Sequence, residues 1–419
     1  MKKIFLKSIT ILHPESDLNG QKTDVLLLDG KIAGFGGNPD EDALIIDGEG
    51  KYLAPGFFDL NVNFGEPGLE TAEDLQSGTA AAAAGGFTGV AVHPNTEPPI
   101  DSKSAVAFIK NKTAGNPVDV YPLGCISRKK EGKDLAELFD MQSAGAVAFT
   151  DGTRSVADPG LMSRALLYAK GLNALVFSYP EDIAIAGKGK MNEGEMSTLL
   201  GMKGIPALAE ELVISRDLYL AEYNEAKIHF STISTKRSVD LIREAKKKGL
   251  AVTCDVAAHH LVLTEELLEG FDSNYKVKPP LRTAEDRDAL LEGLKDGTID
   301  AIVSQHSPSE IEFKNVEFEI ASFGIIGLQT VVPLLLQAGL TPEEIVQKLS
   351  INPRKILSLP IPQIKVGRPA NLVCFDPEME WQFDINSNKS KSANSPFFGR
   401  TLKGGIVLVV NNQNFLHFN

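Results

Sequence analysis

The sequence predicts an α/β protein: a (β/α)8 TIM barrel with a small β-sandwich domain formed by both chain termini. Three observations predict it. Both ends of the chain carry short strand patterns with tight turns, the middle alternates apolar strands with amphipathic helices, and 419 residues suit one large domain with a smaller companion. We therefore expect the barrel at residues 55–360 and the β domain at residues 1–54 together with 361–419.

The two ends of the chain read as hairpins and isolated strands. Residues 24–28, Asp followed by four apolar residues, run into Asp29-Gly30, a strong hairpin signal, and residues 31–35 form the returning strand. Residues 371–375 and 405–410 have the same strand character. Neither end is long enough to bury a core alone, so we expect the two ends to meet in one β domain.

The middle of the chain repeats a strand and then a helix. An Ala-rich helix at residues 71–84 precedes a strand at residues 88–92. Ser234 and Thr283 are each expected to cap a further helix, and residues 300–303 form the strand after the second one. Such repetition predicts a parallel sheet, which closes into a barrel at this size. The carboxyl ends of the strands are where barrel proteins place their chemistry.

The charge and cysteine content exclude some classes of partner. The formal net charge is -13 and the isoelectric point is about 5.1, which argues against a surface for nucleic acid or anionic membranes. Cys125, Cys254 and Cys374 lie far apart in apolar stretches and follow no metal-ligand or disulfide spacing. We therefore expect a cytoplasmic protein with reduced thiols.

A series of short motifs resembles the dihydroorotase family of the amidohydrolase superfamily. Each motif is weak alone, but their order and spacing along nearly the whole chain are specific. The series includes Gly56-Phe57-Phe58-Asp59-Leu60, Glu66-Pro67-Gly68, Pro94-Asn95-Thr96, Glu181-Asp182, His259-His260-Leu261, Pro279-Pro280-Leu281-Arg282-Thr283 and Phe323-Gly324-Ile325. The similar dihydropyrimidinases and hydantoinases use a carboxylated lysine where this chain has Asp151, which favours the dihydroorotase family.

The resemblance implies a zinc-dependent reaction on the cyclic amide of dihydroorotate, because zinc lowers the pKa of bound water to about 7. It implies ligands on the first strand and after the fourth, fifth, sixth and eighth strands, where active members carry histidines and carboxylates. This chain has at those positions Asn61, Asn63, Asp151, Tyr179, Thr232 and Gln305. Amide and hydroxyl oxygens are poor zinc ligands, and Gln305 replaces the Asp that also transfers protons. We therefore expect no metal site and name no catalytic residue.

The resemblance also implies a substrate pocket of which parts remain. We expect its remnants to be Asn95, Lys278, Phe323 and Gly324, whereas Gly65 stands where active members use an Arg to hold the substrate carboxylate. Lys278 has two interpretations that stay open here, a solvated lysine or an anion ligand in a changed pose.

These residues lead to one expectation and two alternatives. We expect a catalytically inactive dihydroorotase-like protein without a cofactor, which forms homo-oligomers and serves as a structural partner of aspartate transcarbamoylase, as similar inactive homologues do. One alternative is a cyclic-amide hydrolase with a rebuilt mononuclear zinc site, for which Asp151, His259 and His306 are the candidate ligands. The other is a small-molecule binding protein that uses Asn95 and Lys278.

Overall fold

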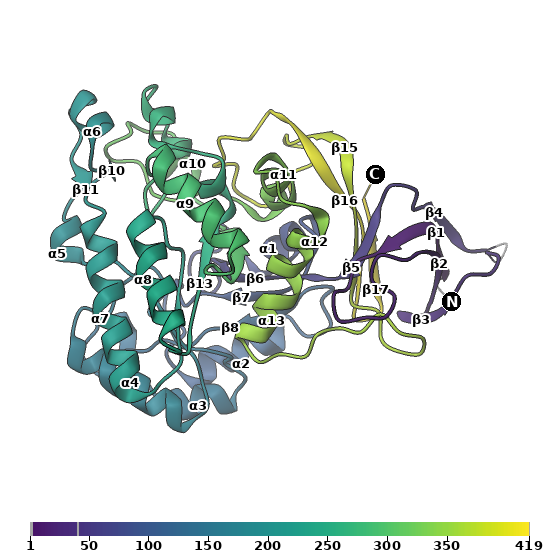
Figure 1. Ribbon diagram of the computed structural model, residues 1–419, viewed down its shortest axis with the longest axis horizontal. Coiled ribbons are helices and arrows are strands. Elements are labelled where there is room, and N and C mark those ends of the chain that lie inside the picture. Colours follow the sequence, from purple (N-terminus) through teal and green to yellow (C-terminus); the bar gives the residue numbers. More distant parts are fainter. Residues whose placement is uncertain (1–2, 40–41, 419) are drawn as a thin grey trace.

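The computed structural model describes residues 3–39 and 42–418, so the outermost residues of the predicted β domain lie outside the described residues. A barrel surrounded by helices forms one part of the molecule, and a β-sheet built from both ends of the chain lies at its side (Figure 1). The predicted α/β fold class is confirmed. The exact domain boundaries stay a prediction.

The barrel wall consists of parallel strands. Their neighbours in space follow chain order, and the strands are β6 (Phe57–Val62), β7 (Phe87–Val92), β8 (Asp119–Pro122), β9 (Val176–Ser178), β12 (Ile228–Phe230), β13 (Val252–Ala257) and β14 (Ala301–Val303). The fourth position of the wall is a single residue, Phe149, which bridges Gly124 and Val176. His306, just beyond β14, bridges Val62 and closes the ring.

Helices cover the outside of this wall. The longer ones are α1 (Leu75–Ala84), α2 (Lys103–Lys112), α4 (Pro159–Gly171), α7 (Leu208–Asn224), α8 (Lys236–Lys247), α9 (Ala284–Lys295) and α11 (Val331–Gln337). Shorter pieces are α3 (Leu138–Ser143), α5 (Ile183–Ala186), β10 (Met191–Asn192), α6 (Glu195–Leu199), β11 (Gly204–Ile205), α10 (Ile311–Lys314), α12 (Pro342–Val346) and α13 (Asn352–Ile356). Within the described residues, no helix combines the length and the apolar character that crossing a membrane requires.

The predicted helix starts are partly confirmed. Thr283 caps α9, because its side chain accepts a hydrogen bond from the backbone N–H of Asp286. The prediction for Ser234 is wrong, since Thr235 caps α8. Ser234 instead donates its hydroxyl proton to Glu210, a buried carboxylate on the neighbouring helix α7.

The two ends of the chain share one sheet, as predicted. Its strands are β1 (Lys3–Ile11), β2 (Lys22–Leu28), β3 (Lys31–Phe35), β4 (Leu44–Asp47), β5 (Tyr52–Pro55), β15 (Leu372–Gln382), β16 (Thr401–Asn411) and β17 (Asn414–His417). β15 pairs antiparallel with β5, which joins the C-terminal strands to the N-terminal ones. Asp29 and Gly30 make the predicted hairpin turn with φ of 46° and 73°. Apolar side chains from both ends, such as Leu6, Val25 and Leu408, form its core.

Candidate active site

The carboxyl ends of the first and sixth barrel strands are joined by side chains at two predicted site positions. The Asn61 amide donates to the Thr232 hydroxyl at 3.1 Å. Thr232 has φ 58°, a left-handed conformation, and its backbone N–H donates to the Asp255 carboxylate at 2.6 Å. Asp255 also accepts a hydrogen bond from His229 at 2.9 Å, and both side chains are fully buried. A buried hydrogen-bond network therefore links the first, sixth and seventh barrel strands at the end of the barrel where the strands' carboxyl ends meet, which we call the barrel mouth.

A second set of polar side chains crosses the mouth from the first strand to the loop after β8. The Asn95 amide donates to Asn63 Oδ1 at 2.6 Å, and Asn63 donates to the His306 carbonyl at 3.0 Å. Lys130 Nζ donates to Asn95 Oδ1 from the other side, at 2.5 Å. Sequence reasoning missed Lys130, because it follows Arg128 and Lys129 in a run that resembles a solvated basic loop.

Asp151 is the carboxylate of the mouth. Its side chain accepts hydrogen bonds from Ser127, from the backbone N–H at 2.9 Å and from the hydroxyl at 2.5 Å. Asp151 is only 2% exposed, and burial raises the pKa of its carboxyl, although the Ser127 hydrogen bonds oppose that shift. A carboxyl at the strand ends whose pKa is raised by burial is a candidate for proton transfer.

Tyr179 and Gln305 complete the positions where active members carry metal ligands. Tyr179 is buried beside Glu181, Thr232 and Arg282, around a cavity of only about 10 Å³. Burial raises the pKa of its phenol well above the usual value, so the group stays protonated. The Gln305 amide donates to the backbone carbonyl of Lys278 at 2.9 Å. Tyr179 is therefore enclosed by its neighbours, and the Gln305 amide is already engaged in a hydrogen bond.

Three of the four predicted pocket remnants, Lys278, Phe323 and Gly324, lie together, whereas Asn95 belongs to the set that contains Asn63 and Lys130. Lys278 Nζ lies 2.8 Å from a Glu181 carboxylate oxygen and 5.5 Å from the centre of the Phe323 ring. Gly324 has φ 111° and follows Phe323 in the same loop. The charge of Lys278 is therefore already paired, which fits neither of its two sequence-based interpretations. Glu181 was part of a quoted motif, but its role as the partner of Lys278 was missed.

Gly65 leaves no room for the side chain that active members use to hold the substrate carboxylate. A Cβ atom at this position would lie 2.3 Å from the backbone oxygen of Leu69. The backbone conformation around Gly65 therefore excludes an arginine, or any other side chain, at this position.

The histidines do not gather around Asp151. His306 Nε2 lies 3.3 Å from Glu73, and His259 packs against His260 with ring centres 4.5 Å apart. Across residues 3–39 and 42–418, no group of three or more His, Cys, Asp or Glu side chains is arranged to hold a metal ion. The proposed ligands Asp151, His259 and His306 are thus not brought together, and the six family positions do not fit a zinc centre.

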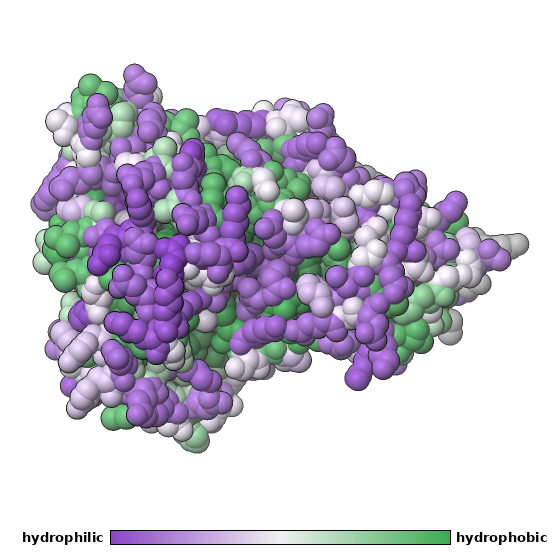
Figure 2. Space-filling view, in the orientation of Figure 1, coloured by the Kyte–Doolittle hydropathy of each residue, from purple (hydrophilic) through white to green (hydrophobic). Residues whose placement is uncertain are grey.

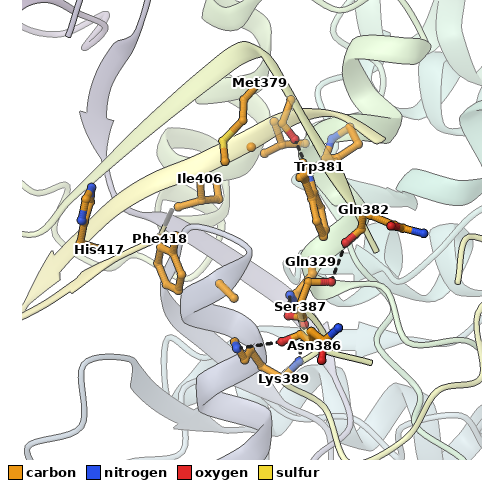
Figure 3. Close-up of a pocket in the computed structure, with 15 residues that line it drawn as sticks. Gln329, Met379, Trp381, Gln382, Asn386, Ser387, Lys389, Ile406, His417 and Phe418 are labelled. Carbon is orange, nitrogen blue, oxygen red and sulfur yellow. Dashed lines mark hydrogen bonds between the residues drawn. The ribbon is translucent and has the colours of Figure 1, made fainter. Parts of the chain in front are cut away.

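A larger cavity, of about 420 Å³, lies away from the strand ends, where β15, β16 and α11 meet (Figure 3). Trp381, Met379 and Phe418 line it on the apolar side. Its polar groups serve local structure: the Trp381 indole N–H donates to the Gly404 carbonyl at 2.9 Å, and the Gln329 amide donates to the Ser387 carbonyl at 3.0 Å. None of the site residues predicted from the sequence lines this cavity.

Comparisons of the sequence place the chain among known proteins. A family model described as dihydro-orotase-like matches residues 50–238, and the amidohydrolase family model matches residues 203–412. A protein of Geotalea daltonii named dihydroorotase is 42% identical, over 99% of this chain and 99% of its own length. A protein of Pelotomaculum thermopropionicum with the same name is 45% identical, over 96% of this chain and 95% of its own.

Solved structures share the fold at lower sequence identity. The L-hydantoinase of Arthrobacter aurescens superimposes with a TM-score of 0.85 at 24% identity, covering 100% of this chain and 96% of its own. A D-hydantoinase gives a TM-score of 0.83 at 25% identity, covering 99% and 95%. These likenesses support the architecture of a barrel with a β domain from both termini.

Proposed function

Because the chain belongs to the dihydroorotase family of the amidohydrolases, we propose that it acts on the cyclic amide of dihydroorotate, by hydrolysing or forming that amide. One observation carries the proposal: relatives named dihydroorotase are 42% and 45% identical over nearly the full length of both chains. Identity on this scale over nearly the whole length shows membership of the family and not only a shared fold.

The prediction of a catalytically inactive protein that serves only as a structural partner is wrong, because these relatives support an active dihydroorotase. The prediction that no cofactor is needed conflicts with the same finding, since the resemblance implies zinc in active members of this family. Both predictions were based on the residue types at six positions and not on the similarity of the rest of the chain to dihydroorotases. The residues at those positions do not supply a zinc ligand set, so the mouth of this chain is rebuilt relative to the zinc site that the resemblance implies.

Asp151 is the group of this rebuilt mouth that suits proton transfer. Opening a cyclic amide requires a proton to leave the attacking water and a proton to reach the departing nitrogen. A carboxyl whose pKa is raised by burial lies closer to neutral pH than an exposed one, which favours both transfers. Ser127 fixes its orientation through two hydrogen bonds.

The Asp151→Asn variant is expected to lower kcat by about 100-fold or more, because the amide cannot exchange protons. It keeps the size of the side chain and an oxygen that accepts from Ser127. Asp134→Asn is the matched control, because Asp134 is exposed in the segment between β8 and α3. This variant is expected to leave kcat unchanged. Steady-state assays with dihydroorotate test this, and equal rates for the two variants would remove Asp151 from the mechanism.

The function itself is tested on the purified full-length chain. Consumption of dihydroorotate and its formation from carbamoyl aspartate are measured with and without added zinc, beside a relative named dihydroorotase. Turnover in either direction above the uncatalysed rate supports the proposal. Absence of turnover in both directions and both metal conditions, while the relative is active, contradicts it.

We also propose that the chain associates with a second copy of itself and with aspartate transcarbamoylase, the partners that the resemblance implies. One face of α7 supports association: Leu208, Leu212, Tyr219 and Tyr223 follow helical spacing and are between 46% and 78% exposed. Apolar surface is visible at the left edge of the molecule, over α5 and α7 (Figure 2).

Replacing Tyr219 and Tyr223 together by lysine is expected to convert an oligomer to a monomer in light scattering, because two charges would be buried in the interface. Replacement of two exposed polar residues elsewhere, Lys247 and Lys248, by alanine is the control. A wild-type chain that elutes as a monomer, and apart from aspartate transcarbamoylase at micromolar concentrations, would contradict both associations.

A further inference from the structure

Lys130 is a half-buried cation of the mouth that has no carboxylate partner. The only hydrogen bond of its side chain among the described residues is the one that it donates to Asn95, and none of the described carboxylates lies within 4.0 Å of its Nζ atom. Lys278, across the mouth, is by contrast paired with Glu181 at 2.8 Å. Burial lowers the pKa of Lys130, because removing an ammonium from water is unfavourable.

The loop that carries Lys130 has an unfavourable backbone conformation at two residues. Lys129 and Lys130 both have left-handed backbones, with φ of 52° and 56°, which non-glycine residues rarely adopt. The turn is tied down on both sides: the Lys129 N–H donates to Asp101 at 2.9 Å, and the Gly132 N–H donates to the Ser127 hydroxyl at 2.9 Å. As a result Lys129 is exposed whereas Lys130 turns toward Asn95.

The surroundings of Lys130 Nζ come from several strand ends. Asn95 follows β7 and links Lys130 to Asn63, at the end of β6. The Thr153 N–H also approaches Asn95 Oδ1, at 3.4 Å, from the loop that carries Asp151. Asp151 attracts Lys130 electrostatically but is hydrogen-bonded to Ser127. The hydrogen-bond partner of the ammonium is thus a neutral amide, whereas Asp151 and Glu97 attract it and Arg154 repels it from beyond hydrogen-bond distance. A small anion at this place gains a charge-assisted hydrogen bond without displacing a salt bridge of Lys130.

We propose that Lys130, positioned by Asn95, binds the carboxylate of the substrate and gives the mouth its preference for acidic over neutral cyclic amides. This inference rests on the proposed function, because it names the substrate class of the same site. Lys130 acts as a specificity-determining residue, and its contribution is to binding rather than to proton transfer.

Binding of two unreactive probes tests the proposal apart from turnover. Orotate and uracil share a planar pyrimidine ring, and only orotate carries a carboxylate. Calorimetry on the full chain is expected to show that the wild type binds orotate at least 10-fold more tightly than uracil. Lys130→Met is expected to remove that preference and leave uracil binding unchanged, and Lys130→Arg to retain most of it. Lys129→Met, the exposed neighbour, is the matched control and keeps the full preference.

The outcomes separate this inference from the proposed function. In turnover, Lys130→Met is expected to raise KM for dihydroorotate about 10-fold with little change in kcat. A Lys130-dependent preference for orotate in a chain without turnover would support the anion site and reject the proposed function. Turnover with an unchanged KM in the folded Lys130→Met variant, or a wild type that does not prefer orotate, would overturn the role of Lys130.

Discussion

The Asp255→Ala variant is expected to lose about 3–5 kcal/mol of its free energy of unfolding, the largest loss predicted for any single substitution here. Asp255 is fully buried on β13 and accepts hydrogen bonds from His229 at 2.9 Å and from the Thr232 backbone at 2.6 Å. Removing the carboxylate leaves both donors without a partner in the barrel interior, where an unsatisfied polar group is costly. Denaturant titration followed by circular dichroism measures the loss.

The matched control for this variant is Asp240→Ala. Asp240 pairs with Arg243 at 2.7 Å on the surface of α8, and its side chain is 38% exposed. Solvent screens this pair, so its loss is expected to change the free energy of unfolding by less than about 1 kcal/mol. Similar losses for the two variants would contradict a structural role for the buried network. If the network also fixes the left-handed backbone of Thr232, Asp255→Ala will disturb the hydrogen bond from Asn61 as well.

Much of the fold follows from local sequence patterns. The alternation of strands and helices predicted the barrel, and Asp29-Gly30 predicted a turn that depends on positive φ at both residues. The fourth strand was not predictable in its actual form, because Phe149 contributes only bridges to Gly124 and Val176. The cap of α8 was misplaced for a different reason. Glu210, on another helix, takes the hydroxyl of Ser234, and no local pattern encodes that tertiary contact.

The site was predictable in its positions but not in its contacts. Asn61 and Thr232 were each placed at a strand end, yet the hydrogen bond between them depends on closure of the barrel over 171 residues of sequence separation. Lys130 was missed because its inward direction follows from two left-handed residues, for which Lys129-Lys130 gives no glycine or asparagine signal. The prediction of an inactive protein was wrong because it considered only the zinc site that the resemblance implies. Residue types at six positions do not exclude a different arrangement of catalytic groups.

The His260→Gln variant is expected to change how stability depends on pH. His260 is 2% exposed, its Nε2 atom lies 3.1 Å from the Pro279 carbonyl, and its Nδ1 atom has no partner among the described residues. Burial lowers the pKa of His260 to about 4, from 6.5 in an unfolded chain, and the nearby Arg282 adds to that shift. Between these two pH values the unfolded chain binds the proton and the folded chain does not. Stability is therefore lost as the pH falls from 6.5 to 4, by roughly 3 kcal/mol for this group.

Glutamine retains a donor for the Pro279 carbonyl but does not titrate, so the variant is expected to lack this loss. At pH 7 the variant is the less stable protein, because the replaced ring packed against His259. The gap in the free energy of unfolding between the two proteins is expected to narrow as the pH approaches 4. Asp59 acts in the opposite direction, since burial raises its pKa to about 7 and the folded chain takes up its proton first. Asp59 is present in both proteins and cancels in the difference, so a gap that stays constant from pH 7 to pH 4 would contradict a neutral, buried His260.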